Sequence, residues 1–266
     1  MDRITQLRRI VLVSIGIFLL DNMEYTPPPQ TEVVEAEKKS NVQERLSERK
    51  LWLAREAAAY AFHKSTGVEP DKARLITQLV EDETNRYKDL SYTQVLGLIV
   101  VESKGNSGAV SPVGARGLMQ LMPETGQFVA ANFDERWRGA QSLHDIQRNI
   151  RYGVWYLHHL RRDFFPEQEK AQLAAYNWGP QAVLDRRAAG QGTPHIYPAQ
   201  VLKAQSKIER DMYEFHSAQF WRSLDLNRDP PHFEDYAPES PGRSRHRDVL
   251  VARGEGKLLR SRRGLQ

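Results

Sequence analysis

Apolar residues recur at helical spacing through most of the chain. From Val42 onward they return every three or four positions, and a second such series begins near Pro70. Further helices are predicted around residues 146–157 and over residues 171–176. Alternation with a period of two, which is typical of half-buried strands, is scarce. The pattern therefore predicts a mainly α protein.

A third helix is predicted to begin at Ser91, where Ser-Tyr-Thr-Gln matches a capping box. Its apolar positions include Leu98 and Ile99. Glu102 follows them four and three positions later, so it lies on the same stripe of the helix. Gly105 then ends the helix.

The position of Glu102 allows two interpretations of its carboxyl group. On an apolar stripe the group is partly desolvated, which penalises the ionised form and raises the pKa. A carboxylic acid that stays protonated near neutral pH can donate a proton to a leaving oxygen. The alternative is a helix-end glutamate that pairs with Lys104 or Arg116. Helical phase alone does not decide between the two.

A cationic start and a short apolar run mark the N-terminus. Three arginines precede the apolar residues 10–20, and Asp21 and Asn22 end the run. The run is shorter than the roughly 20 residues of a full membrane span, and the arrangement is typical of a secretory signal. The alternative is a buried N-terminal helix. We expect residues 1–24 to be a signal peptide or an uncleaved inner-membrane anchor, and the protein to be exported to the periplasm or cell envelope.

Composition divides the rest of the chain. Residues 25–40 hold three consecutive prolines and a charged stretch, and we expect a linker there. A helical extension is expected over 41–88 and the main domain over 89–221. Residues 222–266 are rich in proline and arginine, and 242–266 contain eight Lys/Arg against two Asp/Glu, a net of +6. We expect this tail to be disordered; the alternative is a contact with a partner, a membrane or an anionic polymer.

Overall composition narrows the chemistry. The chain has 266 residues, a net charge of +4 and no cysteine. The length suits one globular domain with extensions, and the lack of cysteine excludes disulfides, thiolate catalysis and cysteine-based zinc sites. His158 and His159 are adjacent, so they point to different faces of a helix and do not suit a metal. We expect no metal, no organic cofactor and no nucleic-acid partner.

Three ordered motifs occur between residues 102 and 180. The first, over 102–125, reads Glu-Ser, an Asn, a Ser, then Gly-Ala-Arg-Gly-Leu-Met-Gln-Leu-Met-Pro and a Thr. Asn149-Ile150 with Gly153 is the second, and Ala-Tyr-Asn-Trp-Gly-Pro over 175–180 is the third. Together they resemble the signature of the soluble lytic transglycosylase (SLT) family, goose-type-lysozyme-like enzymes that act on peptidoglycan. The resemblance covers about residues 90–203 and implies a lysozyme-like helical domain.

The resemblance implies a role for each matching residue. Glu102 would be the single catalytic acid and then the base. Six residues would bind the sugar around the bond that is cleaved: Ser111, Gln120, Met122, Tyr176, Asn177 and Tyr197.

The chain departs from the family pattern at three places. Ser107 follows the motif's asparagine, where members usually carry proline. Trp178 replaces a small residue, and its larger ring could alter which glycan or peptide fits. Thr-Pro-His-Ile precedes Tyr197 where Glu-Thr is common, so the correspondence of Tyr197 rests only on its distance from the third motif.

The implied activity is that of a lytic murein transglycosylase, a carbon–oxygen lyase acting on a polysaccharide. It would cleave the β-1,4 bond between N-acetylmuramic acid and N-acetylglucosamine without water and leave a 1,6-anhydro end. Most glycosidases need two carboxylates, whereas this chemistry needs one. The alternatives are a hydrolytic muramidase of the same fold and a non-catalytic peptidoglycan-binding scaffold. The expected partner is the glycan strand, and a secretion or conjugation machine is a further candidate.

Overall fold

The computed structural model describes residues 30–236. The signal or anchor expected over 1–24, with its apolar run 10–20, lies outside the described residues, as does the tail beyond residue 236. Within 30–236, no helix combines the length and the apolar character that crossing a bilayer requires.

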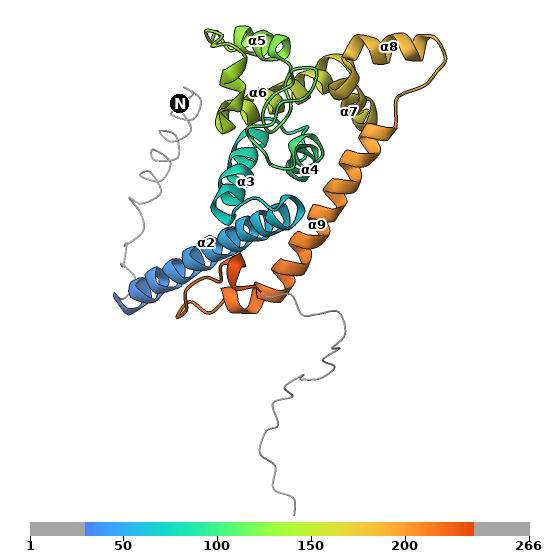
Figure 1. The fold of residues 1–266 in the computed structure, drawn as a ribbon. Coiled ribbons are helices and arrows are strands. Elements are labelled where there is room, and N and C mark those ends of the chain that lie inside the picture. Colours follow the sequence, from blue (N-terminus) through green and yellow to red (C-terminus); the bar gives the residue numbers. More distant parts are fainter. Residues whose placement is uncertain (1–29, 237–266) are drawn as a thin grey trace, which may run out of the picture.

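The described residues are mainly α-helical, as predicted, and isolated bridges at Arg116 are their β-structure. Figure 1 shows how the helices are arranged. The α-helices are α2 (Gln30–Thr66), α3 (Pro70–Thr84), α4 (Tyr92–Ser103), α5 (Pro123–Asn132), α6 (Ile146–His159), α7 (Glu169–Trp178), α8 (Pro180–Ala188) and α9 (Ile196–Ser223). Three short helical turns complete the set: η1 (Ala140–His144), η2 (Leu160–Phe164) and η3 (Phe233–Asp235).

Helix α4 lies at the centre of the fold, in contact with α2, α3 and α9 (Figure 1). Leu98 and Ile99 are fully buried on it, as their stripe predicted. Gly97 allows α9 to come close, because a Cβ there would lie 2.8 Å from the backbone nitrogen of Gln205. The helix that carries Glu102 is therefore held on several sides.

The start of α4 agrees only in part with the predicted capping box. Ser91 is the N-cap, and its hydroxyl accepts a hydrogen bond from the backbone N–H of Gln94 at 3.4 Å. The side chain of Gln94 does not reach back to Ser91, however. It is buried and donates to Glu169 of α7 at 2.6 Å. A tertiary contact thus replaces half of the local motif.

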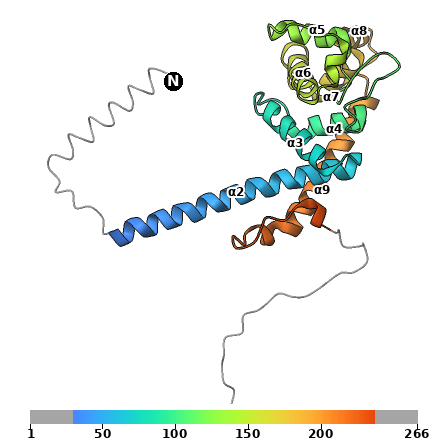
Figure 2. The same cartoon turned by 60° about the vertical axis from the view of Figure 1, so that its left-hand side comes forward.

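Helix α2 begins at Gln30, so helix occupies most of the segment expected to be a linker over 25–40. The three prolines end at residue 29, and the residues that follow are rich in Glu and Lys, which favour helix. Its first turns are exposed and extend away from the domain (Figure 2). The linker expectation was wrong from Gln30 on.

Residues 224–236, which we call the strap, return along α2 and are not the disordered tail that was expected from residue 222 (Figure 1). Phe233 of the strap is only 3% exposed and packs in the main core. Its backbone N–H donates to Glu56 at 3.0 Å, and Arg45 of α2 donates to the carbonyl of Leu226 at 3.1 Å. The proline-rich composition predicted disorder, but the burial of Phe233 anchors the segment to the core.

Replacing Phe233 with Ala is expected to lower the free energy of unfolding by roughly 3–5 kcal/mol, because it empties a buried aromatic site. It also removes the ring beneath the Arg74 guanidinium, which lies 4.7 Å from the ring centroid. Urea unfolding of the full chain measures the change. Trp221, 77% exposed on α9, supplies the matched control, and Trp221→Ala should change stability by about 0.5 kcal/mol or less. Equal effects of the two substitutions would show that the strap adds nothing to the core.

Candidate active site

Glu102 lies on the last turn of α4, immediately before the backbone reverses. Lys104 caps the helix in the left-handed conformation (φ 51°), and Gly105 continues it at φ 75°. The Glu102 side chain is half-buried, and the hydroxyl of Tyr197, at the start of α9, donates a hydrogen bond to its carboxylate. The fold thus joins the end of α4 to the start of α9 through an acid and a phenol.

Burial raises the pKa of Glu102 to about 7, and the hydrogen bond from Tyr197 opposes that rise. Within residues 30–236, no basic side chain pairs with Glu102. Lys104 is exposed, and the guanidinium of Arg116 instead contacts His144 Nε2 at 3.3 Å. The interpretation of Glu102 as an ion-paired helix-end residue is therefore wrong, and the desolvated carboxyl group remains.

This pKa makes the stability of the protein depend on pH. Between about pH 4.5 and pH 7 the folded state binds more protons at Glu102 than the unfolded state, so stability is lost as the pH rises through this window. The full loss is on the order of 3 kcal/mol. Gln cannot ionise, and we expect Glu102→Gln to become more stable than the parent chain as the pH rises from 4 to 8.

Denaturant unfolding at each pH measures this difference. Glu135 gives a contrast of opposite sign, because the hydrogen bond from Tyr152 lowers its pKa. The stability that Glu135 contributes is present above its unfolded pKa and is lost as the pH falls. Glu135→Gln should therefore lose stability relative to the parent chain as the pH rises. A Glu102→Gln curve parallel to that of the parent chain would contradict the raised pKa.

The loop after Glu102 is held by Asn149, which is fully buried on α6. Its amide oxygen accepts from the backbone N–H of Met119 at 2.7 Å, and its amide nitrogen donates to the carbonyls of Arg116 and Leu143 at 3.0 and 2.8 Å. A Cβ at Gly117 would collide with this amide. Sequence reasoning named Asn149 only as part of a motif, and that motif was the signal of its role.

Two of the predicted site residues lie close to Glu102. The Tyr176 hydroxyl donates to the carbonyl of Met119 at 2.8 Å, and Tyr197 donates to Glu102 itself. Burial and the charge of Glu102 raise the pKa of both phenols well above its usual range, so they remain neutral donors. The structure brings one acid and two tyrosines from α4, α7 and α9 into electrostatic contact.

The other predicted residues differ in their surroundings. The Ser111 hydroxyl accepts from the backbone N–H of Ala115 at 3.0 Å, and Gln120 donates to the carbonyl of Gly117 at 2.9 Å. Both side chains therefore hold the loop in shape. Met122 is half-buried at the N-cap of α5, and Asn177 is exposed at the end of α7.

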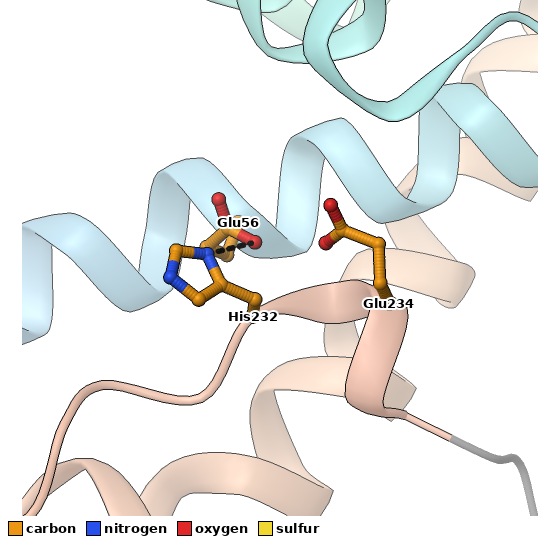
Figure 3. A group of neighbouring side chains, drawn as sticks. All are labelled: Glu56, His232 and Glu234. Atoms are coloured by element: carbon orange, nitrogen blue, oxygen red, sulfur yellow. Dashed lines mark ion pairs between the residues drawn. The ribbon is translucent and has the colours of Figure 1, made fainter.

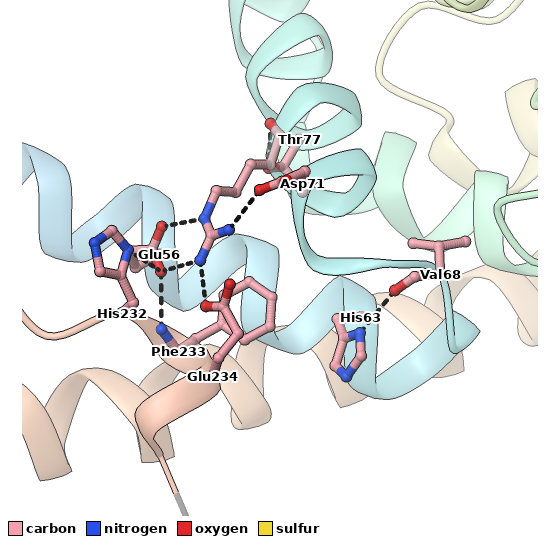
Figure 4. Close-up of polar contacts among 9 residues, drawn as sticks. Glu56, His63, Val68, Asp71, Thr77, His232, Phe233 and Glu234 are labelled. Carbon is pink, nitrogen blue, oxygen red and sulfur yellow. Dashed lines mark hydrogen bonds and ion pairs between the residues drawn. The ribbon is translucent and has the colours of Figure 1, made fainter.

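A separate group of possible metal ligands lies where the strap meets α2. Glu56, His232 and Glu234 bring ligand atoms within 4.8 Å of one another (Figure 3). Figure 4 shows the polar contacts around Glu56, His232 and Glu234. The guanidinium of Arg74 binds both carboxylates, with Nε 2.7 Å from Glu56 Oε1 and a second nitrogen on Glu234. A fixed cation occupies the carboxylates, so we interpret the group as an ion-pair network that fastens the strap.

A known protein family matches the part of the chain that holds this site. Residues 79–195 match the Transglycosylase SLT domain. That range includes Glu102, Asn149 and Tyr176 and ends just before Tyr197. Residues 79–195, which are somewhat less than half of the chain, are thus similar to an SLT domain. The helical SLT domain expected from the motifs is confirmed.

Named relatives agree with this assignment. The chain is 37% identical over 99 residues to the soluble lytic murein transglycosylase of Salmonella typhimurium, covering 37% of this chain and 15% of the relative. It is 33% identical over 152 residues to the membrane-bound lytic murein transglycosylase C of Actinobacillus pleuropneumoniae, covering 54% and 41%. The chain spans less than half the length of these relatives.

Two solved structures align with part of this chain. A lytic transglycosylase from Pseudomonas aeruginosa aligns at 23% identity with a TM-score of 0.38, over 59% of this chain and 26% of the other. The 70 kDa soluble lytic transglycosylase of Escherichia coli aligns at 22% identity with a TM-score of 0.39, over 63% and 31%.

Proposed function

We propose that this protein is a peptidoglycan lytic transglycosylase with Glu102 as its single acid and base. One observation carries the proposal: the Glu102 carboxyl group has a pKa of about 7, caused by burial. Such a group is close to half protonated at neutral pH, so it can both donate and accept a proton. Burial and the hydrogen bond from Tyr197 determine this pKa, and no second carboxylate contributes to it. The lytic murein transglycosylases among the relatives support the same substrate.

In the proposed reaction, protonated Glu102 gives its proton to the glycosidic oxygen between N-acetylmuramic acid and N-acetylglucosamine. The C1–O bond breaks, and the N-acetyl group of the muramic acid stabilises the cationic anomeric carbon. The Glu102 carboxylate then takes the proton of the muramic C6 hydroxyl, whose oxygen bonds to C1. The product is a 1,6-anhydro end, the acid is regenerated, and water does not enter the balance.

The tyrosines have a defined part in this proposal. Tyr197 donates to the Glu102 carboxylate, so it stabilises the ionised form that exists between the two proton transfers. Tyr176 positions the loop through Met119. We propose that Ser111, Gln120, Met122 and Asn177, together with these tyrosines, line the sugar site. Ser111 and Gln120 would do so as parts of a loop that their own hydrogen bonds hold in shape.

The setting of the enzyme is also a proposal. We propose export to the periplasm or cell envelope, with residues 10–20 as an inner-membrane anchor if they remain uncleaved; membrane-bound relatives support this location. The catalytic domain would occupy residues 89–221, preceded by a helical extension that starts at Gln30. We further propose that the helical extension, whose first turns are exposed, and the basic tail dock a secretion or conjugation machine.

Digestion of purified peptidoglycan, followed by mass spectrometry, tests the activity. Anhydro-muropeptides are expected. Products with reducing ends, heavier by one water, would instead identify a hydrolytic muramidase. Binding to the polymer without any cleavage would identify a scaffold. Either of the last two results would overturn the proposal.

A further inference from the structure

A cavity of about 430 Å³ opens beside the start of α6. Its lining comes from the segment that precedes η1 and from the start of α6 with its N-cap: Glu135, Arg136, Arg138, Asp145, Gln147, Arg148 and Arg151. We call it the arginine pocket. Its volume falls within the range of small-molecule sites, roughly 300–1,000 Å³, and exceeds what a single ion needs.

Four arginines line the arginine pocket: Arg136, Arg138, Arg148 and Arg151. Only Arg151 uses its guanidinium in an ion pair, with Glu135 at 2.6 Å. Within residues 30–236, the guanidinium groups of the other three have no hydrogen-bond or ion-pair partner. Unpaired guanidinium groups gathered around one cavity repel each other and favour an anion between them.

The two acids of the pocket form no ion pair with Arg136, Arg138 or Arg148, although the charge of Arg148 contributes to the lowered pKa of Glu135. Glu135 accepts hydrogen bonds from Arg151 at 2.6 Å and from the Tyr152 hydroxyl at 2.7 Å. Asp145 caps α6 by accepting from the backbone N–H of Arg148 at 2.8 Å. Four guanidinium groups and two carboxylates leave the lining with a net charge of +2.

The pocket is also partly fixed before a ligand arrives. Arg151 lies over the ring of Phe133, 4.2 Å from its centroid, while Glu135 holds one of its nitrogens. Trp137 packs against Gly126 of α5, which fastens the loop that carries Arg136 and Arg138. A site that is held in place loses less entropy on binding.

We propose that the arginine pocket binds a small ligand that carries two or more oxyanion groups, either carboxylates or phosphates. The planar guanidinium fork matches both groups by paired N–H···O hydrogen bonds. The cavity has room for the atoms that link two such groups. This binding is distinct from the proposed cleavage at Glu102 and does not depend on it.

Calorimetric titration of the full chain with citrate and with pyrophosphate tests the proposal. Binding is expected for at least one probe, with one ligand per chain, and Arg148→Gln should weaken it about tenfold, the loss of one charge-assisted hydrogen bond. The pair Arg138→Gln and Arg148→Gln should weaken it further. Arg210→Gln, an exposed arginine of α9 outside the pocket, should bind like the parent chain.

The two probes separate the sources of the charge. Citrate binding alone assigns the pocket to carboxylates, such as those of an acidic peptide; pyrophosphate binding alone assigns it to phosphates. The inference is overturned if neither probe binds at millimolar concentration, or if the pocket variants and Arg210→Gln weaken binding equally. Because binding is read without cleavage, an inactive enzyme could still confirm the pocket, and an active one could lack it.

Discussion

Glu102→Gln is expected to abolish peptidoglycan cleavage while the fold stays intact. Gln keeps an oxygen that can accept the hydrogen bond of Tyr197, but it has no proton to give to the glycosidic oxygen. General acid–base catalysis typically contributes 10²- to 10⁴-fold, and one group here serves both steps. We therefore expect the rate to fall by roughly 10³-fold or more.

The release of anhydro-muropeptides per unit time measures this loss. Glu48→Gln is the matched control, because Glu48 is exposed on the projecting part of α2 and should not change the rate. Unfolding of Glu102→Gln at pH 8 separates a chemical defect from a folding defect, since this variant should be at least as stable as the parent chain. A stable Glu102→Gln protein with an undiminished rate would refute Glu102 as the acid.

The features that local sequence determines were predictable. The stripe of Leu98 and Ile99 placed Glu102 on a buried helix face, and desolvation does raise its pKa. Helical phase could not show which cation, if any, would lie beside it. Arg116 is close in sequence, but its guanidinium contacts His144, a residue 28 positions further along the chain.

The features that were missed depend on contacts between distant parts of the chain. Phe233 and Glu56 are 177 positions apart, and their hydrogen bond is one of the contacts that hold the strap against α2. The proline content of the segment predicted disorder, because local composition carries no information about a contact with a residue so distant in the sequence. Gln94 is a similar case. The capping box predicts that its side chain binds Ser91, but this side chain donates to Glu169 of α7 instead.

Asn149→Leu is expected to remove activity without touching any residue that we propose to contact the sugar. Leu fills a similar volume but leaves the Met119 N–H and the Leu143 carbonyl without these partners, whereas the Arg116 carbonyl still accepts from the Leu121 N–H at 3.0 Å. Each unsatisfied buried group costs about 1–3 kcal/mol, so stability should fall by roughly 2 kcal/mol or more. The loop around Met119, whose carbonyl accepts from the Tyr176 hydroxyl, would also lose its fixed position, and the rate of cleavage should fall as a result.

Asn149→Asp tests whether the two donated hydrogen bonds are responsible. An ionised Asp can still accept from the Met119 N–H, but its second oxygen would face the carbonyls of Arg116 and Leu143 with no proton to donate. Burial would raise the pKa of this new carboxyl group, and its protonated form could donate to one carbonyl. The stability deficit relative to the parent chain should therefore shrink as the pH falls from 8 to 5. Asn132→Leu, at an exposed position of α5, should show neither the deficit nor its dependence on pH, because its amide bonds only the Phe128 carbonyl at the surface. A pH-independent deficit in Asn149→Asp would mean that Asn149 acts through packing and not through its hydrogen bonds.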